Sequence, residues 1–165
     1  MHLLLSLVLL QVPSVPLGGQ PYLDVRSPLV LEMGHVKVSV TASVSLRVQD
    51  LPSFCGSPLV KGQGLIDWGW NLVRNSEGMK LSFSRPLSFF AVDAGDWSGD
   101  DDGPLELTAF DCDGRQVAQA TSAWGAEKWP PFATLKVEGK GICWVRYRSG
   151  GQHAGSTFIT NLRGE

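Results

Sequence analysis

The feature that most constrains the fold is a long two-residue alternation between His35 and Val48. Apolar side chains stand at every second position from Val36 to Val48, and Lys, Ser, Thr and Arg fill the positions between them. Because successive side chains of a strand point to opposite faces, this pattern predicts a strand with one buried face. Strands usually have about 3–10 residues, so we expect a bend or bulge within this one.

Seven further strands are predicted after residue 78, where β-type segments and turn signals alternate regularly. They are Met79–Ser84, Leu87–Asp93, Leu105–Asp111, Arg115–Thr121, Ala133–Glu138, Ile142–Arg148 and Thr157–Leu162. No window has a helical period, and 19 glycines with 10 prolines favour turns. The sequence therefore predicts an all-β fold, an antiparallel β-sandwich or jelly roll of eight to ten strands, in a single domain over residues 20–165.

The order of short and long connections predicts where a ligand binds. If each connection reverses the chain, the short turns at 85–86, 112–114 and 139–141 lie at one end of the sandwich. The long connections 62–78, 94–104, 122–132 and 149–156 then lie at the other end, and they contain five of the six tryptophans. Since binding residues favour loops on a rigid scaffold, we expect a recognition surface there.

Within that surface, two tryptophans are candidates for stacking on a sugar ring, because indole combines an apolar face with one N–H donor. These are Trp97 and Trp124, with Asp96, Asp101 and Glu127 accepting hydrogen bonds from ligand hydroxyls. The alternative is structural: Trp68, Trp70 and Trp129 cap the core, and the acidic run Asp100–Asp102 is a solvated turn.

Trp144 is a separate candidate. The two-residue period places Cys143, Val145 and Tyr147 on the inner face of a strand and Trp144, Arg146 and Arg148 on the outer face, since unpaired arginine is rarely buried. An outward tryptophan beside arginine is either part of a flat ligand-binding platform or a structural cation–π pair.

The stretch from Phe90 to Gly114 resembles a known family. It reads FAVDAGDWSGDDDGPLELTAFDCDG and is similar to the V-D-x-G-D … D-D … L-x-L-x-A-Y-D-x-x-G core of bacterial cell-surface jelly-roll domains. These domains belong to the galactose-binding-like, carbohydrate-binding-module-like group. The segments ATLKVEGKGI and TFITNL resemble the last strands of that family, so the resemblance covers roughly residues 44–163. It implies the fold more strongly than a function.

The resemblance also implies a structural calcium ion, bound between an early acidic residue and a late Asp-Asn-Leu. Asp50 and Asn161 match these positions, although Thr160 stands where the family often has aspartate. Calcium prefers six to eight oxygen ligands, so the missing carboxylate weakens the match.

The N-terminal segment indicates export. Residues 1–14 match a signal peptide with a short apolar core, and no stretch is long and apolar enough to span a membrane. An N-terminal buried strand is the alternative. Cys55, Cys112 and Cys143 allow one disulfide and leave one thiol, and the sequence does not select the pair.

Several function classes are disfavoured. The net charge of −2 offers no basic patch for nucleic acid, and no nucleophile or zinc-protease motif is present in the sequence. We therefore expect a secreted or cell-surface, non-enzymatic module that binds polysaccharide or another cell-surface glycan. The alternative is a structural surface protein that self-associates through an exposed edge, formed by the Val36–Val48 strand.

Overall fold

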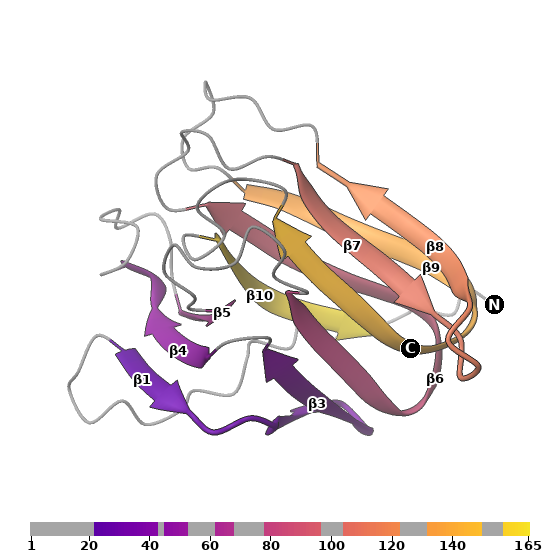
Figure 1. Ribbon diagram of the computed structural model, residues 1–165, viewed down its shortest axis with the longest axis horizontal. Coiled ribbons are helices and arrows are strands. Elements are labelled where there is room, and N and C mark those ends of the chain that lie inside the picture. The colour runs from indigo at the N-terminus through magenta and orange to yellow at the C-terminus, as the bar shows by residue number, and fades with distance from the viewer. Residues whose placement is uncertain are drawn as a thin grey trace, which may run out of the picture.

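The structure is a computed structural model that describes residues 22–42, 45–52, 62–67, 78–96, 104–122, 132–149 and 157–165. These residues form ten strands, and every pairing is antiparallel (Figure 1). The strands are β1 (Tyr22–Val25), β2 (Leu29–Met33), β3 (Val36–Ala42), β4 (Leu46–Asp50), β5 (Gln63–Asp67), β6 (Met79–Asp96), β7 (Leu105–Phe110), β8 (Gln116–Thr121), β9 (Phe132–Ser149) and β10 (Thr157–Gly164). The predicted all-β antiparallel sandwich is confirmed.

One continuous hydrogen-bonded sheet doubles over to make the two layers. The first half of β6 and the second half of β9 pair with each other and with β3 and β7, and β2 and β8 lie at the outer edges of this front sheet. The second half of β6 and the first half of β9 continue into the back sheet, with β10, β5, β4 and β1. The two halves of β6 face each other across the core, where the Phe83 and Phe90 ring centroids lie 4.9 Å apart.

The bends in β6 and β9 occur where the sequence predicted turns. Arg85-Pro86 lies inside β6, where proline cannot donate to the strand ladder, and the β6–β9 register shifts between Ser82 and Leu87. Gly141 lies at the matching place in β9 and has φ of +79°, which a residue with a side chain rarely adopts. Arg85-Pro86 and Gly141 therefore bend continuous strands and do not end them. The four strands predicted in these two segments are thus the two long strands β6 and β9.

The core contains the residues that alternation placed inside. Val36, Val38 and Val40 of β3 are buried, as are Leu46 and Val48 of β4. However, the single strand predicted over His35–Val48 is wrong: β3 pairs with β6 in the front sheet, and β4 pairs with β5 in the back sheet. The expected bend is thus a complete change of layer. β1, β2 and β5 were not predicted from the sequence, and β5 lies within the predicted long connection 62–78.

The chain reversals give the molecule two distinct ends. Figure 1 shows both bends and the turn between β7 and β8 at its right-hand side, which we call the turn end. The strand ends that flank the long connections lie at the opposite side, the loop end, where Leu105 pairs with Ser149 and Asp96 with Thr157. The predicted separation of short turns from the ends of the long connections is confirmed for the described residues.

A disulfide between Cys112 and Cys143 joins the β7–β8 turn to β9 just after its bend. The two residues are 31 positions apart in sequence, and their Cα atoms are 5.1 Å apart. The structure therefore selects a pair that the sequence left open, whereas Cys55 lies outside the described residues.

Candidate functional site

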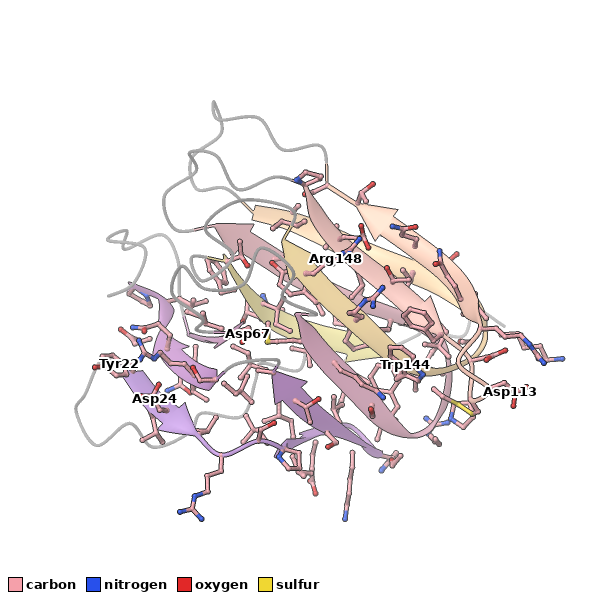
Figure 2. The ribbon with its side chains drawn as sticks, viewed as in Figure 1. Tyr22, Asp24, Asp67, Asp113, Trp144 and Arg148 are labelled. Atoms are coloured by element: carbon pink, nitrogen blue, oxygen red, sulfur yellow. A yellow bond between two sulfur atoms is a disulfide. The ribbon has the colours of Figure 1, made fainter. Side chains whose placement is uncertain are left out.

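The outer face of the front sheet carries the candidate site whose side chains the structure describes. On β9, Val145 and Tyr147 are buried in the core, and Trp144, Arg146 and Arg148 lie on the opposite side. Figure 2 shows Trp144 and Arg148 on the same sheet face. The predicted outward orientation of Trp144 is therefore confirmed.

Trp144 is packed between two neighbours. Its ring stacks on Phe110 of β7, with centroids 3.8 Å apart and planes 8° from parallel. The Nζ of Lys80, on β6, lies 4.5 Å from the centroid of the Trp144 ring. Because β6 and β7 flank β9 on opposite sides, these neighbours cover opposite faces of the indole. The two faces of the Trp144 ring are therefore covered, and its edge is the part left for other contacts.

The expected cation–π contact is present with different partners. Lys80 lies over Trp144, whereas the guanidinium carbon of Arg146 is 5.5 Å from the centroid of Phe110. Two cations and two stacked rings thus form one cluster, which we call the aromatic–cation cluster: Lys80, Phe110, Trp144 and Arg146. Each cation–π contact at such a site contributes about 0.5–1 kcal/mol.

Arg148, the next outward residue of β9, is paired differently. Its Nε and Nη2 donate to the two carboxylate oxygens of Glu106, each at 3.1 Å, and the Thr108 hydroxyl donates to the same carboxylate. Burial alone would raise the pKa of Glu106, but the hydrogen bonds from Arg148 and Thr108 outweigh it, and the pKa lies below its ordinary value. Glu106 is thus an ionised partner of Arg148, and the charge of Arg146 also lowers its pKa.

Arg146 and Lys80 do not form a hydrogen-bonded ion pair of this kind. They are direct Cα partners across β6 and β9, so their side chains leave the same face of the sheet side by side. Among the described residues, neither forms an ion pair, and the Nε of Arg146 is buried without a hydrogen-bond acceptor.

The remaining predicted ligand contacts belong to the loop end. Trp97, Trp124, Asp101 and Glu127 lie outside the described residues. Asp96 is the last residue of β6, and its backbone pairs with Thr157 at the loop end. The structure thus places the strand ends that flank these residues, and their contacts with a ligand stay predictions.

Asn161, predicted as a calcium ligand, belongs to a network around Asp93. Its Nδ2 donates to Asp93 Oδ2 at 2.8 Å, while Arg163 Nη2 and Thr134 Oγ1 donate to Oδ1 at 2.5 and 2.8 Å. Asn161 has φ of +50° and lies at the β10 irregularity between Thr160 and Arg163. Asp93 therefore stabilises this irregularity.

Asp50 and Asn161 lie on strands that flank β5. Asp50 pairs with Gln63, whose backbone carbonyl accepts the hydroxyl of Thr160 at 2.9 Å. Within the described residues, no group of three or more His, Cys, Asp or Glu side chains is arranged to hold a metal ion. Two side chains supply too few oxygens for calcium, so these residues alone do not fit the ion, and calcium binding stays a prediction.

Lys80 and Phe110 were not predicted from the sequence as site residues. Both lie at outward positions of alternating strands, which is a signal that the sequence contains. Their contact with Trp144 depends on the order β6-β9-β7, which joins segments more than 30 residues apart and leaves no local pattern.

Comparisons with known proteins support the fold. No family model matches the sequence, and no curated protein matches it. A DUF4465 family protein from Bacteroides caccae is similar in structure, with a TM-score of 0.51 at 8% identity, covering 87% of this chain and 86% of that protein. A family 6 carbohydrate-binding module from Clostridium cellulolyticum, solved with xylose, aligns over 64% of this chain and 80% of its own, with a TM-score of 0.37 at 14% identity.

No helix among the described residues has the length and hydropathy needed to cross a membrane. At 8% identity, the likeness to the Bacteroides protein concerns the fold alone. The chain is therefore similar in fold to that protein. The β-sandwich that the sequence resemblance implied is present.

Proposed function

We propose that this protein is an exported, non-catalytic recognition module that binds polysaccharide. The observation that carries the proposal is the gathering of strand ends at the loop end, on either side of connections that contain five of the six tryptophans. A rigid sandwich stapled by a disulfide is a suitable scaffold for such connections, and disulfides persist in oxidising, extracytoplasmic compartments.

The test is binding to a panel of polysaccharides, by glycan array and by pull-down with insoluble polymers. We expect at least one polysaccharide to bind. Trp97→Ala and Trp124→Ala should each weaken that binding about tenfold or more, as expected for an aromatic contact at the centre of an interface. Phe89→Ala is the matched control, because Phe89 is a partly exposed aromatic residue of the back sheet.

Two outcomes would contradict the proposal. One is the absence of any binder among neutral and acidic polysaccharides. The other is polysaccharide binding that is as strong in Trp97→Ala and Trp124→Ala as in the control Phe89→Ala. This result would show that the loop end does not take part in recognition.

Self-association through a strand edge is the second candidate, but the edge differs from the predicted one. Each half of the Val36–Val48 segment is an interior strand, because β3 lies between β2 and β6, and β4 lies between β1 and β5, so that expectation is wrong. Among the described strands, β8 is an outer one, pairs only with β7, and has no charged residue over Gln116–Thr121. Charged residues normally protect such edges.

Size-exclusion chromatography at several protein concentrations tests this second candidate. Assembly through β8 predicts larger species as concentration rises, and Gln119→Lys, at an exposed position of β8, should abolish them. A single monomeric peak at all concentrations would exclude it.

A further inference from the structure

Two residues of like charge in the aromatic–cation cluster are directly opposite each other on neighbouring strands. Lys80 and Arg146 are Cα partners, and side chains at such positions have Cβ atoms about 4.5–5.5 Å apart. Like charges at this separation destabilise a sheet. A sheet that keeps Lys80 and Arg146 as partners despite this destabilisation is expected where an anion binds between the two cations.

The neighbouring residues do not neutralise the pair. Glu106 is the acidic residue of the adjacent strand β7, and Arg148 and Thr108 occupy both its oxygens. The outward residue Ser82 of β6 is uncharged, as is Thr41 of β3, whose backbone pairs with Lys80. Within the described part of the chain, Glu106 is thus shared by Arg148 and Arg146, whose charges both lower its pKa, and one carboxylate against three cations leaves this face with a net positive charge.

The guanidinium group of Arg146 indicates a specific ligand chemistry. Its Nε is buried and has no acceptor in the described structure, and a buried donor without a partner costs about 1–3 kcal/mol. Because this Nε is shielded from solvent, an incoming carboxylate or sulfate oxygen would accept from the terminal N–H groups of the same guanidinium. Guanidinium groups favour such planar or multi-oxygen anions because they offer several donors in a fixed geometry.

The shape of the surface favours a polysaccharide over an acidic peptide. The strands that carry the cluster, β6, β9 and β7, are each paired on both sides, so they offer no free backbone edge on which a peptide could add a strand. The face instead carries a row of outward side chains along β9, from Trp144 near the turn end to Arg148 near the loop end. A polymer with hydroxyls and regularly spaced anionic groups fits a surface of this kind.

We propose that the ligand is an acidic polysaccharide, and that a carboxylate or sulfate group of one sugar unit binds between Lys80 and Arg146. This inference rests on the proposed function for the class of ligand, but it uses the front-sheet face and not the loop-end tryptophans. Since the whole chain has a net charge of −2, the attraction is local to this face.

The experiment compares charged and uncharged forms of the same polymers. Isothermal titration calorimetry with the full chain uses polygalacturonate, alginate and dextran sulfate as acidic probes, and methyl-esterified polygalacturonate and dextran as their uncharged counterparts. We expect at least one acidic polymer to bind, with affinity that falls as salt concentration rises. Its uncharged counterpart should bind at least about tenfold more weakly.

Variants assign the binding to the two cations. Lys80→Gln and Arg146→Gln should each weaken binding of the acidic polymer about tenfold. Lys136→Gln is the matched control, because Lys136 also lies on β9 beside an aromatic ring, Phe89, but in the back sheet and paired with Glu138. Thermal melting of each variant verifies that it is folded.

The outcomes separate this inference from the proposed function. Binding of neutral polymers alone would overturn the inference and leave the proposed function standing. Equal binding of poly-L-glutamate would also overturn it, because charge without sugar would then suffice. If acidic polymers bind and folded Lys80→Gln and Arg146→Gln lose no more affinity than Lys136→Gln, the site is elsewhere and the inference is wrong.

Discussion

Asp93→Asn tests the most highly connected polar group that the structure describes. The Asp93 carboxylate accepts hydrogen bonds from Arg163, Asn161 and Thr134, and it forms an ion pair with Arg163 in which both side chains are largely buried. Asparagine keeps the size of the side chain but replaces one acceptor oxygen with a donor. A donor would then face another donor, and Arg163 would lose its counter-charge.

The expected loss of stability follows from these contacts. Hydrogen bonds to charged groups contribute about 1.5–3 kcal/mol, and removal of one partner of a half-buried pair leaves the other uncompensated, so we expect a loss of about 2–3 kcal/mol. For a chain of this size, that corresponds to a melting temperature about 5–10 °C lower. Urea unfolding followed by tryptophan fluorescence at pH 7 measures it. Asp113→Asn is the control, since its exposed ion pair with Arg115 predicts a loss under about 1 kcal/mol.

The same variant gives a pH prediction. Burial raises the pKa of Asp93, but hydrogen bonds from Arg163, Asn161 and Thr134 and the charge of Arg163 lower it further than burial raises it, so the pKa lies below 3.8. The stabilisation is therefore complete above about pH 4 and is lost as the pH falls through the folded-state pKa. Wild type and Asp93→Asn should differ at pH 7 and converge in acid. Equal stability at pH 7, or a difference that persists in strong acid, would refute the reasoning.

Three further predictions concern other parts of the structure. Gly78→Ala should destabilise the fold by more than about 2 kcal/mol, because Gly78 has φ of +76° and an added Cβ would lie 2.0 Å from the Tyr147 carbonyl oxygen; an unchanged urea midpoint would contradict this. Reduction of the Cys112–Cys143 disulfide should lower the free energy of unfolding by about 3–4 kcal/mol, as unfolding with and without reductant would measure, and a loss under about 1 kcal/mol would argue against it. If Asp50 contributes to a calcium site, calcium should raise the melting temperature relative to chelator and Asp50→Asn should abolish the increase; identical melts would remove the support for calcium.

The sequence predicted the face of each strand better than it predicted the strand's limits. The alternation from Val36 to Val48 assigned the buried positions correctly on both sides of the break, because each side chain's face depends only on local backbone geometry. The same pattern did not reveal that the segment changes sheets. Similarly, Arg85-Pro86 predicted a change of direction, but whether a strand ends or bends there depends on its partner, β9.

The candidate site divides in the same way. The outward position of Trp144 followed from its neighbours Val145 and Tyr147, which alternate with it in sequence. Its stacking on Phe110 and its contact with Lys80 required the pairing of β9 with β7 and β6. Asn161 was selected from a motif, yet its amide contacts Asp93, which lies 68 residues away in sequence.

The amino-acid sequence by itself determined the fold class, the inner and outer face of the main strands, and the grouping of short turns at one end and long connections at the other. These features arise from the two-residue period of a strand and from chain reversal, and both are local. Tertiary structure alone decided the Cys112–Cys143 pair, the layer of each half of β6 and β9, and the juxtaposition of Lys80 with Arg146. These depend on which distant strands become neighbours, and packing of the common core fixes that choice.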